Sequence, residues 1–124
     1  MADDPRPPVW VGHVVLRVSD LERSKEYWTR LGLRFVGSGA SVCVLELRGG
    51  THLVLLPAER PVQPGTPAPF DLMVDDVDAT RGRWEGLGLA PTEIQRGEIH
   101  DSFRVRDPSG YDLTVNSSHV VGPV

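Results

Sequence analysis

Cysteine and aromatic residues are scarce in this chain of 124 residues, and positive charge is not in excess. Cys43 is the only cysteine, which excludes an internal disulfide and a cysteine-based zinc framework and favours a reducing, cytoplasmic environment. Because Cys43 lies in an apolar run, we expect it to be a small core residue. The length fits one domain that buries a sizeable core.

The charge balance and the apolar runs exclude two classes of partner. Thirteen Lys and Arg residues against 17 Asp and Glu give a net charge of −4 without a basic cluster, so we expect no nucleic-acid partner. No apolar run approaches the roughly 20 residues that span a bilayer. The acidic, proline-rich start also differs from a signal peptide, so we expect no membrane partner.

Composition divides the chain into five segments of one domain. Proline-rich stretches without an apolar period mark the flexible or extended parts, and strand and helix periods mark the folded parts. The segments are a flexible lead over 1–9, a βαβββ module over 10–57, a proline-rich connector over 58–68, a second βαβββ module over 69–118 and a tail over 119–124.

Turn and cap residues bound the elements expected in each module. Helices are predicted over 21–31, after Asp20, which is suited to N-capping, and over 75–87, a capped segment that begins with two Asp residues. Each is followed by a Gly suited to end it. A DPSG turn precedes the last strand. The predicted strands cover 10–18, 33–37, 41–47, 51–57, 70–74, 90–94, 100–107 and 111–117.

The two modules also resemble each other in sequence. Residues 14–33 placed on 70–89, at an offset of 56, give seven identities in twenty positions, and the last two strands align at an offset of 60. Composition alone would give on the order of one or two identities. We therefore interpret the chain as a tandem duplication, with a ligand site expected in the cavity between the copies.

Three segments carry a family resemblance: GHVVLRVSDLERSKEYWTRLGL, VDDVDATRGRWEGLGL and DPSGYDLTV. Together they resemble the vicinal oxygen chelate superfamily, which includes glyoxalase I, extradiol dioxygenases, fosfomycin-resistance enzymes and bleomycin-resistance proteins. The likeness covers about residues 10–118. It implies an α+β fold in which two tandem βαβββ modules form a cavity with curved sheets.

The resemblance also implies where a divalent metal ion would bind. Metal-dependent members use four side chains, one on the first and one on the last strand of each module. His13 lies at the first of these positions, and the internal alignments place Val54, Pro69 and Thr114 at the others. Valine and proline offer no lone pair and a neutral hydroxyl is a poor ligand, so we expect no metal at the usual positions and no cofactor.

Strand periodicity predicts which other residues face the cavity. His52 shares the face of Val54, Asp71 that of Pro69, and Asp112 that of Thr114. A displaced metal site on His13, His52 and Asp112 stays open, as does a metal-free acid–base pair, while Asp71 and Asp112 also fit solvated strand ends. The predicted ligand-binding residues are His13, Val15, His52, Val54, Leu56, Asp71, Asp112 and Thr114.

Two functions follow from this reading. The first is a metal-independent small-molecule-binding protein that sequesters an organic compound, as the bleomycin-resistance type does. The second is a glyoxalase-like or dioxygenase-like lyase, isomerase or oxygenase with a displaced divalent metal on His13 and His52. One fold hosts both, so whether the chain is an enzyme stays open. We also expect a homodimer, because proteins of this size in the superfamily are often dimers.

Overall fold

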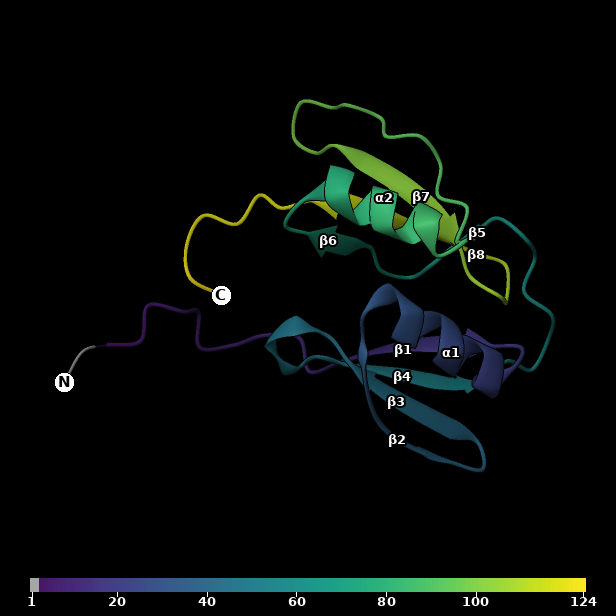
Figure 1. Cartoon of the computed structure of the whole chain (residues 1–124). Coiled ribbons are helices and arrows are strands. Elements are labelled where there is room, and N and C mark those ends of the chain that lie inside the picture. The colour runs from purple at the N-terminus through teal and green to yellow at the C-terminus, as the bar shows by residue number, and fades with distance from the viewer. Residues whose placement is uncertain (1–2) are drawn as a thin grey trace.

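The computed structural model describes residues 3–124 and contains two α/β units that follow one another along the chain (Figure 1). The first two residues of the predicted lead lie outside this described part. The α+β fold class expected from the sequence is confirmed, with two principal helices and two open sheets.

The first four strands form one sheet in the order β1-β4-β3-β2. β1 (His13–Val18) runs parallel to β4 (His52–Pro57), and β4 is antiparallel to β3 (Val42–Glu46), which pairs with β2 (Arg34–Gly39). A short 3-10 turn, η1 (Arg48–Gly50), leads from β3 into β4. Buried residues alternate with more exposed ones along β1 and β4, so the sheet has one core face and one open face.

Helix α1 (Leu21–Leu31) covers the core face of this sheet, with the bounds expected from the sequence. The Asp20 carboxylate accepts a hydrogen bond from the backbone N–H of Arg23 and caps the first turn. Gly32 ends the helix with a φ of 120°, a conformation that strongly favours glycine. Trp28 lies fully buried on the inner side of the helix.

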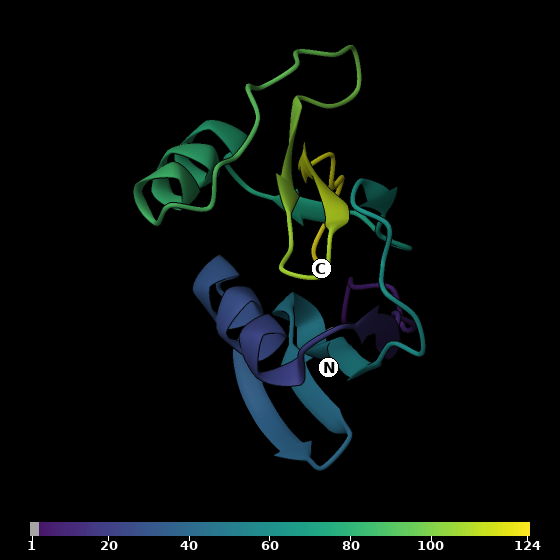
Figure 2. The ribbon, with the colours of Figure 1, turned by 90° about the vertical axis from the view of Figure 1, so that its right-hand side faces the viewer.

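The second sheet is built around β8 (Tyr111–Ser117). This strand is antiparallel to β7 (Ser102–Arg106) and parallel to two short strands, β5 (Thr66–Pro67) and β6 (Leu72–Val74). Helix α2 (Val77–Gly86) follows β6 and is capped by Asp76. In Figure 2 both helices lie on the left, and β7 and β8 lie to the right of α2.

Several predicted strand bounds were wrong. The strand expected at 10–18 begins at residue 13, and the one expected at 70–74 begins at residue 72. β5 lies inside the segment predicted as a connector. Pro69, which has no N–H group, lies between β5 and β6, so the edge of the second sheet is interrupted.

The strand predicted over 90–94 is not formed, and only an isolated bridge joins Gln95 to Ser102. Pro91 has no N–H group to donate. The backbone N–H of Arg104 donates to the Thr92 side chain rather than to a backbone carbonyl, at 2.8 Å. This local side-chain acceptor replaces one bond of a regular ladder.

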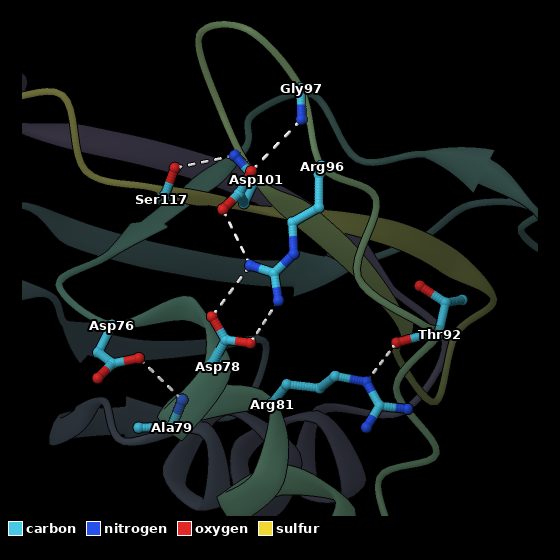
Figure 3. A network of polar contacts seen from close by, with 9 residues as sticks. All are labelled: Asp76, Asp78, Ala79, Arg81, Thr92, Arg96, Gly97, Asp101 and Ser117. Atoms are coloured by element: carbon cyan, nitrogen blue, oxygen red, sulfur yellow. Dashed lines mark hydrogen bonds and ion pairs between the residues drawn. The ribbon is translucent and has the colours of Figure 1, made fainter.

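The loop that contains Arg96 is held by side-chain contacts rather than by a ladder of backbone hydrogen bonds (Figure 3). The Arg96 guanidinium donates to the Asp78 carboxylate on α2, at 2.7 Å, and to the Asp101 carboxylate, at 2.9 Å. Arg81 on α2 donates from Nε to the Thr92 carbonyl, at 2.7 Å. These contacts hold the loop against α2.

The register of the parallel strand pairs supports the internal duplication. Leu16 of β1 lies opposite Leu55 of β4, and Leu72 of β6 lies opposite Val115 of β8. The two pairs are related by the same offsets, 56 and 60, that align the sequences. The repeat seen in the residues is therefore matched by a repeat in strand pairing.

One continuous apolar core joins the two units. Trp28 of α1 packs against Phe70 at a ring separation of 6.0 Å, and the Tyr111 hydroxyl donates to the Arg17 carbonyl at 2.7 Å. Cys43 is 1% exposed, which confirms its predicted place in the core. Across residues 3–124, neither helix has the length and apolarity needed to cross a membrane.

Candidate functional site

All eight residues predicted to bind a ligand lie on the open faces of the two sheets. On the first sheet they alternate with the buried Leu16, Leu53 and Leu55, and on the second with the buried Leu113 and Val115. The first sheet carries His13, Val15, His52, Val54 and Leu56, and the second carries Asp71, Asp112 and Thr114.

A row of four polar residues crosses the open face of the first sheet, with one residue on each strand. His13 lies opposite His52, His52 opposite Glu46, and Glu46 opposite Arg34. The His52 Nε2 atom lies 3.0 Å from Oε1 of Glu46, and Arg34 donates to the other carboxylate oxygen. The rings of His13 and His52 meet edge to face with centroids 5.9 Å apart. We call these residues the polar row.

The negative charge of Glu46 determines which groups of the polar row donate and which accept hydrogen bonds. The Arg34 guanidinium, and then the His52 ring, hold the pKa of Glu46 below its ordinary value, so Glu46 is an acceptor at neutral pH. His52 Nε2 must then carry a proton and donate to Glu46. In a neutral imidazole this leaves Nδ1 with the lone pair.

Apolar side chains occupy the next row of the same face. Val15 lies opposite Val54, and Val54 lies opposite Val44. Val15 is 45% exposed although it is a large apolar residue. The open face of the first sheet therefore presents an apolar surface with hydrogen-bonding groups along one side, as ligand sites commonly do.

The open face of the second sheet is charged. Asp112 accepts a hydrogen bond from Nε of Arg106 at 2.8 Å, and that guanidinium holds the pKa of Asp112 below its ordinary value. Asp71 accepts from the Asn116 amide at 3.0 Å. A depression of about 420 Å³ here is lined by Pro67, Ala68, Pro69, Phe70, Asp71, Asp112 and Thr114.

A larger depression, of about 560 Å³, lies where the connector passes the end of β1. Its lining includes Arg17, Arg60 and Tyr111, none of which the sequence indicated as ligand-binding. It is wide open to solvent, and the Arg17 guanidinium already donates to the Pro57 carbonyl.

The residues that the resemblance places at the usual metal positions do not fit a divalent ion. His13 is joined there by Val54, Pro69 and Thr114, and neither an aliphatic chain nor a proline ring can donate an electron pair. Among residues 3–124, no group of three or more His, Cys, Asp or Glu residues is placed to hold a metal ion. The set His13, His52 and Asp112 is therefore not brought together within one chain, and Asp112 is paired with Arg106 instead.

Glu46 and Arg34 were not among the predicted site residues. From the sequence, Glu46 fits either a partly buried acid or, more simply, an exposed strand position. Its side chain is only 19% exposed because it lies between His52 and Arg34. Its position in an apolar strand, on the face shared with Val44 and Val42, was the available signal. Which residue lies across from it depends on strand register, which the sequence does not specify for β2 and β3.

Comparison with known proteins identifies one family and many solved structures with a similar fold. The model of the glyoxalase/bleomycin resistance protein/dioxygenase superfamily matches residues 10–115. A search of curated proteins finds no match.

Solved structures with this fold include enzymes and binding proteins. A lactoylglutathione lyase from Agrobacterium tumefaciens is 23% identical, with a TM-score of 0.73, over 91% of this chain and 96% of that one. TnmS3, an antibiotic binding protein from Streptomyces sp. CB03234, is 24% identical, with a TM-score of 0.75, over 88% of this chain and 95% of that one. At these identities the likeness shows the fold alone.

Proposed function

The chain belongs to the glyoxalase/bleomycin resistance protein/dioxygenase superfamily, and within it we propose that this protein binds a small organic molecule without a metal ion. The observation that carries the proposal is the open face of the first sheet. There an apolar row that includes Val15 and Val54 lies beside the polar row. Val54 lies at a position where the resemblance to metal-dependent members implies a metal ligand. TnmS3, described as an antibiotic binding protein, supports this direction.

In this proposal apolar contact supplies most of the affinity. Val15, Val54 and Leu56 would cover the body of the ligand, and His13, His52 and Thr114 would orient its polar groups. Asp71 and Asp112 would lie at the edge of the site, where their carboxylates are already paired with Asn116 and Arg106.

The second candidate is an enzyme with a displaced metal, and the adjacent rings of His13 and His52 are the observation in its favour. Elemental analysis of protein purified without chelator or affinity tag separates the two. We expect far less than one metal ion per chain, with no change in His13→Ala or His52→Ala. Near-stoichiometric metal that both substitutions abolish would establish the enzyme reading and overturn ours.

The proposal includes a homodimer in the cytoplasm. One open face covers only one side of a bound molecule, and Val15, Val36 and Met73 are each at least 45% exposed in the single chain. A second copy would cover such apolar surface and enclose the ligand. We expect light scattering to give about twice the chain mass of 13.6 kDa, and a mass near 13.6 kDa would contradict the dimer.

A further inference from the structure

The polar row contains an imidazole whose two ring nitrogens have different roles. His52 Nε2 is bound to Glu46, and both oxygens of that carboxylate are occupied, one by His52 and one by Arg34. Glu46 is thus not free to contact a ligand. Its effect is to hold His52 as a single tautomer with the lone pair on Nδ1.

Within the described residues, Nδ1 of His52 makes no hydrogen bond, and the His52 side chain is 32% exposed. The edge-to-face contact with His13 is not a hydrogen bond either. Nδ1 is therefore an acceptor of fixed position that belongs to no other contact, and an O–H donor is its natural complement.

The charges of the row are balanced. Within the row, the formal charges of Arg34 and Glu46 offset each other. An ionic ligand would find no net opposite charge here, so the row suits a neutral molecule.

Strand geometry sets the size of that molecule. Residues two apart along a strand are separated by roughly 7 Å, so the apolar row of Val15, Val54 and Val44 lies about that far from the polar row. A flat molecule of two fused rings spans this distance when its body lies on the valines and a hydroxyl reaches His52.

We propose that the Glu46–His52 pair makes this face selective for neutral, flat, apolar molecules that carry a hydroxyl hydrogen-bond donor. The inference rests on the proposed function and adds the ligand class and its specificity-determining residue. Glu46 acts as a positioning residue, because it reaches the ligand only through His52.

The test compares 2-naphthol with 2-methoxynaphthalene, in which a methyl group replaces the hydroxyl hydrogen and removes the donor, by equilibrium dialysis at pH 8 with EDTA present. Wild type is expected to bind 2-naphthol about tenfold more tightly, the value of one hydrogen bond to a polarised acceptor. His52→Phe keeps an aromatic ring and removes the acceptor, so the two affinities are expected to become equal within about twofold. In Glu46→Gln the tautomer is no longer fixed, and most of the preference is expected to disappear.

Two matched controls locate the effect. His100→Phe changes an imidazole outside the polar row, whose Nδ1 lies 3.0 Å from the Ser117 carbonyl oxygen, and is expected to retain the preference. Val54→Ala is expected to weaken both compounds by the same factor and leave their ratio unchanged. Far-UV circular dichroism of each variant checks that the fold is kept.

The outcomes distinguish the inference from the proposed function. If wild type binds both compounds equally, or if His100→Phe loses the preference while His52→Phe keeps it, the inference is wrong and the proposed function stands. If wild type binds neither compound, with or without EDTA, the naphthalene-sized ligand class is wrong. Metal-dependent binding of either compound would overturn the proposed function as well.

Discussion

Trp28→Ala is expected to lower the free energy of unfolding by about 3 to 5 kcal/mol. The side chain is fully buried, and it packs edge to face against Tyr27 and in a tilted arrangement against Phe70 of the second unit. The substitution leaves a cavity at the joint between the two units, which packing cannot close without moving α1. Urea denaturation followed by far-UV circular dichroism measures the loss.

Two comparisons make this prediction specific. Trp28→Phe is expected to cost less than Trp28→Ala, because the indole N–H has no hydrogen-bond partner among the described residues and only volume is lost. Phe35→Ala removes a ring that is 41% exposed and is expected to cost less than either. Equal losses in Trp28→Ala and Phe35→Ala would contradict the assigned core.

Asp107→Ala is expected to lower the free energy of unfolding by about 2 to 3 kcal/mol. Oδ1 of this buried carboxylate accepts backbone N–H groups from Ser109, Gly110 and Tyr111 at 3.1, 2.9 and 2.8 Å. Alanine would remove the side-chain acceptor from these N–H groups of the turn before β8 and leave only the Gly110 N–H with a second acceptor, the Asp107 backbone carbonyl. Asp107→Asn keeps an oxygen acceptor, so it is the matched control and is expected to lose less.

The same residue gives a pH dependence of known sign. Burial raises the pKa of Asp107 above its ordinary value of 3.8, although its three backbone hydrogen bonds oppose the shift. The folded state therefore binds this proton more tightly than the unfolded state, and its favourable contribution is complete below about pH 3.8. That contribution is lost as the pH rises through the folded pKa.

This contribution is isolated by subtracting the free energy of unfolding of Asp107→Asn from that of wild type at each pH. The difference is expected to fall as the pH rises from 3.8, whereas the carboxyls paired with arginines, such as Asp112, change stability in the opposite direction. A difference that rises over this range would show that hydrogen bonding outweighs burial at Asp107.

Much of the fold was predictable because local chemistry specifies it. Asp20 caps the first helix as predicted, and Asp76, inside the segment predicted as the second helix, caps that helix. Gly32 ends the first helix in the left-handed conformation that its position requires. Alternation along β1, β4 and β8 also gave the open faces, since the period of a strand is fixed by backbone geometry. These features depend on neighbours in sequence.

The rest depends on partners far apart in sequence. Glu46 contacts His52 and Arg34 only because three strands meet in one register, which includes a shift in β2 between Phe35 and Gly37. The segment at 90–94 has strand-like residues, but Thr92 and Pro91 replace or remove bonds of the ladder. Neither outcome follows from composition or period.

The most direct test of metal-independent binding on the open faces is an NMR titration of EDTA-dialysed protein with 2-naphthol. We predict shifts in the methyl signals of Val15, Val44, Val54 and Leu56, with Leu53 and Leu55 on the core face much less affected. Shifts that appear only after Zn²⁺ or Ni²⁺ is added, or that are confined to the core face, would contradict the account.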